Sequence, residues 1–109
     1  MTDLERSALR FAWLRAKGQT LKSQRDAILC KHEIEDDGDG LPCWKARVGY
    51  NTPDGDPAFR YEREFCDACQ VRTALHNELA EINAKRGAAL RVLMLRAKQA
   101  TADTMGEYR

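Results

Sequence analysis

The sequence predicts a mainly α-helical protein in which two long antiparallel helices are joined by a short β-hairpin. Apolar residues alternate at spacings of three and four in the first quarter of the chain and again in its last third. The prolines and most of the glycines lie in the segment between, where they interrupt any helix. The 109 residues are expected to form one domain, because this is an ordinary length for a single domain.

The first helix is predicted to extend from Asp3 to about His32. Its apolar side chains form a single stripe, which consists of Leu4, Phe11, Leu14, Leu21 and Ile28. Thr2 precedes the helix and is a suitable N-terminal cap. Gly18 is the weak point of this helix, with an expected cost of up to about 1 kcal/mol relative to alanine.

The segment from about residue 33 to 65 is predicted to contain a loop and a β-hairpin. Residues 43–50 and 58–65 are short runs that suit strands, and the second alternates aromatic with polar side chains. Residues 51–57 between them are rich in Asn, Pro, Asp and Gly, which favour turns. We therefore expect the two runs to pair as antiparallel strands.

The second helix is predicted to extend from residue 67 to about residue 101, and residues 102–109 are predicted to be a flexible tail. A spacing of four and three is kept throughout by Leu75, Leu79, Ile82, Arg86, Ala89, Leu93, Arg96 and Ala100. This repeat is typical of a helix that packs along its length against another helix.

The similar lengths of the two helices suit antiparallel packing. If Cys30 lies beside Cys69, the numbers of paired residues sum to about 99, and Phe11 and Trp13 face the small residues 87–89. Two helices alone leave one side of the apolar stripe uncovered. We therefore expect either a homodimer that forms a four-helix bundle or docking onto another protein.

Four cysteines lie at the ends of the predicted elements. Cys66 and Cys69 form a C-x-x-C motif at the start of the second helix, Cys30 is near the end of the first, and Cys43 opens the first strand. Antiparallel helices would bring all four together, and four thiolates are a common ligand set for Zn²⁺. His32 is a reserve ligand. Four sulfur ligands leave no open position on the metal, so the zinc would be structural.

Two other states of the cysteines are open: reduced thiols that pack as small apolar side chains, and a redox or disulfide pair at the C-x-x-C motif. A calcium loop that begins at residues 35–40 is disfavoured, because Ala46 occupies the position of the bidentate glutamate. No nucleotide-binding, serine hydrolase, zinc protease or zinc deaminase motif occurs. We therefore expect a non-enzymatic protein with no catalytic residue and no small-molecule substrate.

Charge is unevenly distributed, although the formal net charge is only +1. Residues 4–31 carry seven basic and two acidic side chains, residues 33–67 carry four and ten, and residues 68–100 carry six and two. The candidates for phosphate contacts with nucleic acid are Arg6, Arg10, Arg15, Lys17, Lys85, Arg86, Arg91 and Arg96. The simpler interpretation of these side chains is a solvated helix surface.

The N-terminal residues lack the basic start and apolar run of a signal peptide. No stretch approaches the roughly 18 apolar residues of a membrane span. We therefore expect a cytoplasmic protein that binds no membrane. Because thiols stay reduced in the cytoplasm, this compartment favours metal binding over disulfides.

A pattern of cysteine and aromatic residues leads from the predicted hairpin into the second helix. It consists of Cys43-Trp44, Phe65-Cys66-x-x-Cys69, Arg72 and Leu75-His76. This pattern resembles small uncharacterised cysteine-containing proteins of tailed bacteriophages, and the resemblance covers about residues 30–98. It implies a phage-encoded accessory protein that acts in the cytoplasm of a bacterial host, and it implies no particular activity.

The sequence therefore predicts a zinc-stabilised interaction protein without enzymatic activity, which would modulate a host protein complex. One alternative is a nucleic-acid-binding accessory protein that uses the basic helix ends. The other is a thiol redox protein that uses Cys66 and Cys69.

Overall fold

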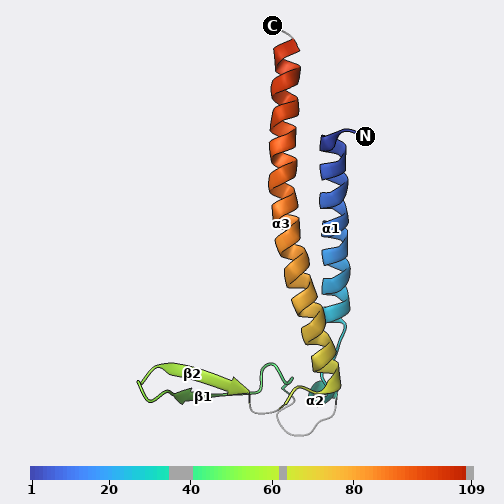
Figure 1. The fold of residues 1–109 in the computed structure, drawn as a ribbon. Coiled ribbons are helices and arrows are strands. Elements are labelled where there is room, and N and C mark those ends of the chain that lie inside the picture. The colour runs from blue at the N-terminus through green and yellow to red at the C-terminus, as the bar shows by residue number, and fades with distance from the viewer. Residues whose placement is uncertain (35–40, 62–63, 108–109) are drawn as a thin grey trace. The chain divides into compact units, whose positions relative to one another are not determined.

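The computed structural model describes residues 1–34, 41–61 and 64–107 (Figure 1). Its elements follow in the order α1 (Asp3–Asp26), α2 (Lys31–Ile34), β1 (Arg47–Asn51), β2 (Pro57–Tyr61) and α3 (Asp67–Glu107). The predicted fold class is confirmed, because two long helices pack together and an antiparallel β-hairpin lies between them in sequence. None of the described helices is both long and apolar enough to cross a membrane.

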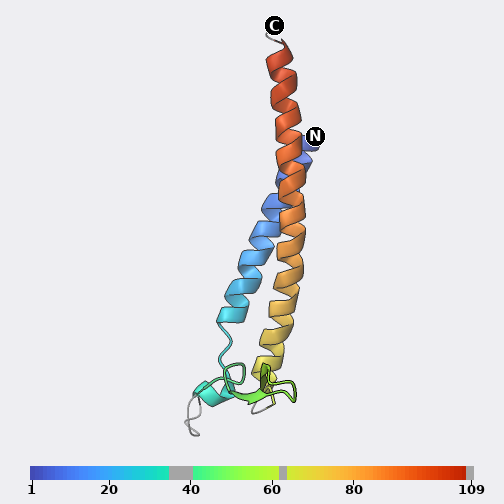
Figure 2. The same cartoon turned by 90° about the vertical axis from the view of Figure 1, so that its left-hand side faces the viewer.

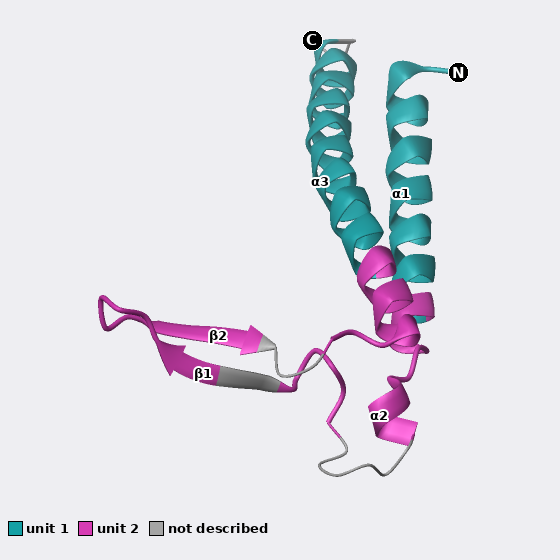
Figure 3. Ribbon diagram, turned by 60° about the horizontal axis from the view of Figure 1, so that its bottom comes forward, with its two compact units in different colours: residues 1–23, 76–109 teal, residues 24–75 magenta. Residues whose placement is uncertain are grey.

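The chain divides into two compact units, which Figure 3 shows in different colours. The helical unit comprises Met1–Ser23 and His76–Arg109. The cysteine unit comprises Gln24–Leu75, with α2, the β-hairpin and the first turns of α3. Each unit has buried side chains of its own: aliphatic ones in the helical unit and mainly cysteines in the cysteine unit.

The core of the helical unit is a layer of aliphatic side chains between two antiparallel helices. Leu14 and Leu21 of α1 are buried, as are Leu79, Ile82 and Ala89 of α3. All five belong to the stripes that the spacing of three and four residues predicts. Figures 1 and 2, which differ by a 90° turn, both place the N-terminal half of α1 beside α3.

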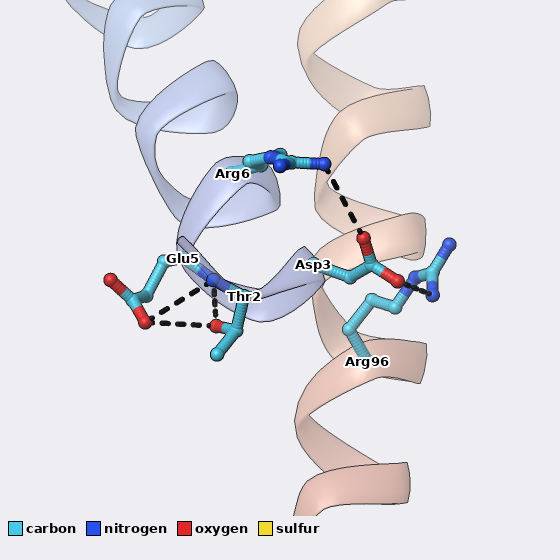
Figure 4. Close-up of polar contacts among 5 residues, drawn as sticks. All are labelled: Thr2, Asp3, Glu5, Arg6 and Arg96. Carbon is cyan, nitrogen blue, oxygen red and sulfur yellow. Dashed lines mark hydrogen bonds and ion pairs between the residues drawn. The ribbon is translucent and has the colours of Figure 1, made fainter.

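Two contacts define the register of this helix pair. Arg96 Nη1 donates a hydrogen bond to Asp3 Oδ2 at 3.0 Å, as Figure 4 shows, and the two residue numbers sum to the predicted value of about 99. A Cβ placed on Gly18 would lie 3.6 Å from Ile82 Cγ2 and 3.8 Å from Leu79 Cδ1. The residue numbers sum to 100 for Gly18 with Ile82 and to 97 for Gly18 with Leu79, which is within two of the predicted 99. The predicted register of the two helices is therefore confirmed.

The predicted placement of Trp13 against residues 87–89 is wrong, because the Trp13 side chain is 61% exposed. Phe11, in contrast, lies in the stripe and is half-buried. Two residues along an α-helix correspond to a turn of about 200°, so Phe11 and Trp13 cannot both face α3.

The N-terminus of α1 has the predicted threonine cap. Glu5 N donates to Thr2 Oγ1 at 3.1 Å, and Thr2 N donates to Glu5 Oε1 at 3.4 Å, as Figure 4 shows. This reciprocal pair is a capping box, which satisfies backbone groups that the first helical turn leaves unpaired. Arg6 Nη1 lies 3.9 Å from Asp3 Oδ1, so the Asp3 carboxylate attracts cations from both helices.

The first helix ends at Asp26 rather than at His32, the end that the sequence predicts. Residues 27–30 are not helical, and α2 begins at Lys31. Cys30 caps α2, since its backbone N donates to Glu33 Oε2 at 3.0 Å and its carbonyl accepts from Glu33 N at 3.0 Å. The break in the helix allows the Cys30 sulfur to reach the other cysteines.

The second long helix continues to Glu107, so residues 102–107 are helical instead of forming the predicted flexible tail. The sequence lacks proline over this stretch. The hydroxyl groups of Thr101 and Thr104 donate to the carbonyl oxygens of Ala97 and Ala100, both at 2.9 Å. These bonds satisfy the two hydroxyls within the helix itself.

The β-hairpin is shorter than predicted, with five residues in each strand instead of eight. Residues 43–45 form a turn before β1, in which Ala46 N donates to Pro42 O at 3.1 Å. Gly49 is paired with Phe59, and the Phe59 ring approaches the Gly49 Cβ position to 3.3 Å. Gly55 in the connecting turn has a φ of 85°, a conformation that favours glycine.

Candidate metal centre

The structure brings the four predicted cysteines together in the cysteine unit. The Sγ atoms of Cys30, Cys43, Cys66 and Cys69 all lie within 4.8 Å of one another. Cys30 follows α1, Cys43 precedes β1, and the C-x-x-C pair spans the start of α3. Three of these side chains are fully buried, and Cys66 is half-buried. The group could hold one metal ion.

The separations between the sulfur atoms fit a tetrahedral ion. A tetrahedron with metal–sulfur bonds of about 2.3 Å has edges of about 3.8 Å. Cys30 Sγ lies 3.5 Å from Cys43 Sγ and 3.8 Å from Cys66 Sγ. All four cysteines are free thiols, and these separations are far longer than the roughly 2.05 Å of a disulfide.

Backbone N–H groups surround the sulfur atoms and favour thiolates. Cys43 N donates to Cys30 Sγ at 3.3 Å. Cys66 Sγ accepts from the backbone of Lys31 and Cys69, and Cys43 Sγ accepts from the backbone of Cys66. Because Cys66 immediately precedes α3, the backbone N–H of Cys69 in the first helical turn can donate to its sulfur. The C-x-x-C motif thus supplies two sulfur ligands and also a backbone N–H donor to one of them.

The thiols differ in how readily they ionise. Burial opposes ionisation of Cys66, but hydrogen bonds from the backbone of Lys31 and Cys69 and from neighbouring thiols outweigh it and lower the pKa to about 6. Burial raises the pKa of both Cys69 and Cys43 above the ordinary value. Without metal, the cluster therefore holds a Cys66 thiolate beside the protonated thiols of Cys43 and Cys69. A metal ion would displace these protons, because ligand thiols bind as thiolates.

His32 lies against two of the four sulfur atoms. Its Nδ1 is 3.4 Å from Cys43 Sγ and 3.5 Å from Cys30 Sγ. These distances suit N–H···S hydrogen bonds, in which the imidazole would donate to the two sulfur atoms once a metal holds them as thiolates. The predicted role as a reserve ligand remains a prediction, since four sulfur atoms already form the ligand group.

Aromatic side chains that sequence reasoning did not assign to the site cover the cluster. Trp44 and Phe65 pack against the buried cysteines, and each follows or precedes a cysteine in sequence. The guanidinium carbon of Arg72 lies 4.1 Å from the centre of the Trp44 ring. This cation–π contact connects the first turns of α3 to the segment before β1. The sequence held a signal for these contacts, because an aromatic residue stands directly beside each of two cysteines, in Cys43-Trp44 and Phe65-Cys66.

The eight basic residues predicted as phosphate contacts all lie in the helical unit. Arg6 and Arg96 contact Asp3. Arg10 and Lys85 line one groove of about 300 Å³ with Ser7, Ala88, Ala89 and Val92. Arg15 and Arg91 are exposed, and Lys17 and Arg86 are half-buried.

The disfavoured calcium loop at residues 35–40 lies outside the described residues. Comparison with known proteins gives no further guide to the site. No protein-family model, no curated protein and no solved structure matches this chain. The function is therefore argued from the cysteine cluster and from the surface of the helical unit.

Proposed function

We propose that the chain is a non-enzymatic, zinc-stabilised interaction protein that modulates a host protein complex. The cluster of four sulfur atoms carries this proposal. Zinc would hold the segment after α1, the segment before β1 and the start of α3 at one point. The cytoplasm of a bacterial host, implied by the phage resemblance, would be its place of action.

Zinc is the metal that best suits these ligands. Soft thiolates select Zn²⁺, Cu⁺ and iron, and among them Zn²⁺ adopts tetrahedral four-sulfur coordination in structural sites without redox chemistry. When bound, the ion would supply folding free energy to the cysteine unit, whose described core consists almost entirely of the ligands themselves. Four sulfur ligands leave no position for substrate or water, which supports a structural role.

Exposed apolar side chains on the helical unit support the interaction role. Leu9 and Trp13 of α1 and Val92, Met94 and Leu95 of α3 are each about half exposed or more. Large apolar groups at a surface, such as Leu9 and Trp13 four residues apart on one side of α1, commonly mark a protein contact. A hairpin of two helices buries only the stripe between them, so further surface is available to a partner.

Elemental analysis and thiol titration of the purified protein test the proposal. We expect about one zinc per chain and protected thiols. The Cys69→Ser variant should lose the metal, and the control variant Ala68→Ser should keep it, because Ala68 lies in the same turn but supplies no ligand. Iron in place of zinc, or a metal-free protein with four reactive thiols, would contradict the proposal. A tagged protein should also retain a host complex, and Cys69→Ser should weaken that retention.

Nucleic acid binding is the second candidate function. The observation that favours it is the groove in which Arg10 from α1 and Lys85 from α3 converge. Binding through phosphate contacts should weaken steeply as salt rises. The double variant Arg10→Gln/Lys85→Gln should then reduce the salt dependence, and the absence of a gel shift at low salt would remove this candidate.

A further inference from the structure

A groove between α1 and α3 combines two cations with an apolar lining. It has a volume of about 300 Å³, and we call it the basic groove. Its lining consists of Ser7 and Arg10 of α1 and of Lys85, Ala88, Ala89 and Val92 of α3. No carboxylate belongs to this described lining. Both walls lie within the helical unit, where Figures 1 and 2 place the two helices side by side.

The two cations of the basic groove lie on opposite walls. In the register of the helix pair, Arg10 is level with about residue 89, so Lys85 lies about one helical turn, or roughly 6 Å, further along the groove. Both side chains are exposed, and neither forms an ion pair or a hydrogen bond with any residue of 1–34, 41–61 or 64–107. Both charges can therefore pair with a ligand.

The rest of the basic groove suits a third helix. Val92 is 47% exposed, and Leu95, three residues further on the same side of α3, is 56% exposed. The other uncharged lining residues are small, namely Ser7, Ala88 and Ala89. Small side chains let another helix approach closely, and a helix packs against a helix pair by placing its own side chains in such a groove.

We infer that the basic groove binds an amphipathic helix of another protein, in which acidic residues flank an apolar stripe. The apolar stripe would cover Val92 and the small residues of the lining. Carboxylates on its two flanks would reach Arg10 on one wall and Lys85 on the other, one turn apart. The inference rests on the proposed interaction role and states the chemistry of the partner.

The charges favour this occupant over two others. A two-fold symmetric pair uses the same patch on both copies, so a second copy of this chain would place Arg10 and Lys85 against cations. Nucleic acid would pair its phosphates with the two cations, but its contacts with proteins are mostly polar, and it would cover little of Val92 and Leu95. An acidic amphipathic helix satisfies both the cations and the apolar lining.

Fluorescence anisotropy of labelled peptides with the full chain tests the inference. The probe is an amphipathic peptide of about 20 residues, with leucines on one side and glutamates on both flanks. It should bind, and a peptide with glutamine in place of each glutamate should bind about tenfold more weakly. Arg10→Glu/Lys85→Glu should weaken the glutamate peptide by about tenfold or more and should bind a lysine version instead. The matched control Arg15→Glu/Arg91→Glu makes the same change in net charge at exposed residues outside the groove, and its effect should stay below about threefold.

Three results with the peptides would overturn the inference: no binding of the glutamate peptide, equal binding of the glutamate and glutamine peptides, or equal effects of the two double variants. An oligonucleotide of equal charge that binds more tightly than the peptide, and that needs Arg10 and Lys85, would also overturn it in favour of nucleic acid.

Retention of a host complex and zinc content are measured on the same variants. If Arg10→Glu/Lys85→Glu retains the complex as well as the wild type does, this inference fails and the proposed function stands. If the glutamate peptide binds as expected but the protein contains no zinc, the proposed function fails and the basic groove stands.

Discussion

Gly18 is expected to be a site where alanine stabilises the protein. It is buried in the interior of α1, where glycine costs about 1 kcal/mol relative to alanine. A Cβ at this position would lie 3.6 Å from Asn83 Oδ1, 3.6 Å from Ile82 Cγ2 and 3.8 Å from Leu79 Cδ1. These are ordinary van der Waals distances, so the added methyl group fits without movement. Gly18→Ala should therefore raise the free energy of unfolding by about 1 kcal/mol, or the midpoint temperature by roughly 4 °C.

Urea unfolding followed by circular dichroism measures this change. Gly87→Ala is the matched control, because its Cβ would meet only Arg91 Nη1, at 3.8 Å, so the gain there reports helix propensity alone. The two variants should gain similar amounts. Gly18→Leu should instead destabilise, since several added carbon atoms cannot fit between the helices. Loss of stability in Gly18→Ala, with a gain in Gly87→Ala, would refute the spacing of α1 and α3 on which this reasoning depends.

Four further predictions concern the cysteine unit. A chelator should unfold it before the helical unit, which circular dichroism and tryptophan fluorescence of Trp44 against a Trp13→Phe background would detect. His32→Ala should weaken zinc affinity by about tenfold to a hundredfold, measured by competition with a chromophoric chelator, because the thiolates lose a hydrogen-bond donor. Arg72→Ala should cost about 1 kcal/mol in urea unfolding, since the contact with Trp44 is lost, and an unchanged midpoint would contradict this role. In metal-free protein at pH 7, mass spectrometry should find Cys66 alkylated first. Its rate should fall as the pH drops through about 6, where the thiolate is protonated.

Helix packing could be predicted because periodicity and packing depend on the same side chains. The spacing of three and four that identifies Leu14 and Leu21 as a stripe also places them against Leu79 and Ile82, since only one side of each helix can be buried there. The cysteine cluster followed from topology, because antiparallel elements bring their adjoining ends together. What remained unpredicted within the site were contacts such as that between Arg72 and Trp44, which depend on tertiary placement.

Element boundaries were harder to predict, because local signals did not determine them. The apolar stripe of α1 continues through Ile28, yet the helix ends at Asp26. Residues 102–107 contain a threonine and a glycine, yet they are helical. Helix propensity differs by less than about 1 kcal/mol per residue among these residue types, so a few tertiary contacts or a continuous helical backbone outweigh it.

The early end of α1 follows from what the sulfur atoms require. N–H groups that point toward a thiolate cluster stabilise it, and a backbone N–H inside a helix is already bonded to a carbonyl. After the break at Asp26, the start of α2 supplies the backbone N–H of Lys31 to Cys66 Sγ, and the turn at Cys43 supplies an N–H to Cys30 Sγ. A helix that continued to His32 would have used the Lys31 donor internally. The end of α1 at Asp26 is therefore part of the cysteine site, because it leaves the Lys31 N–H available to the Cys66 sulfur.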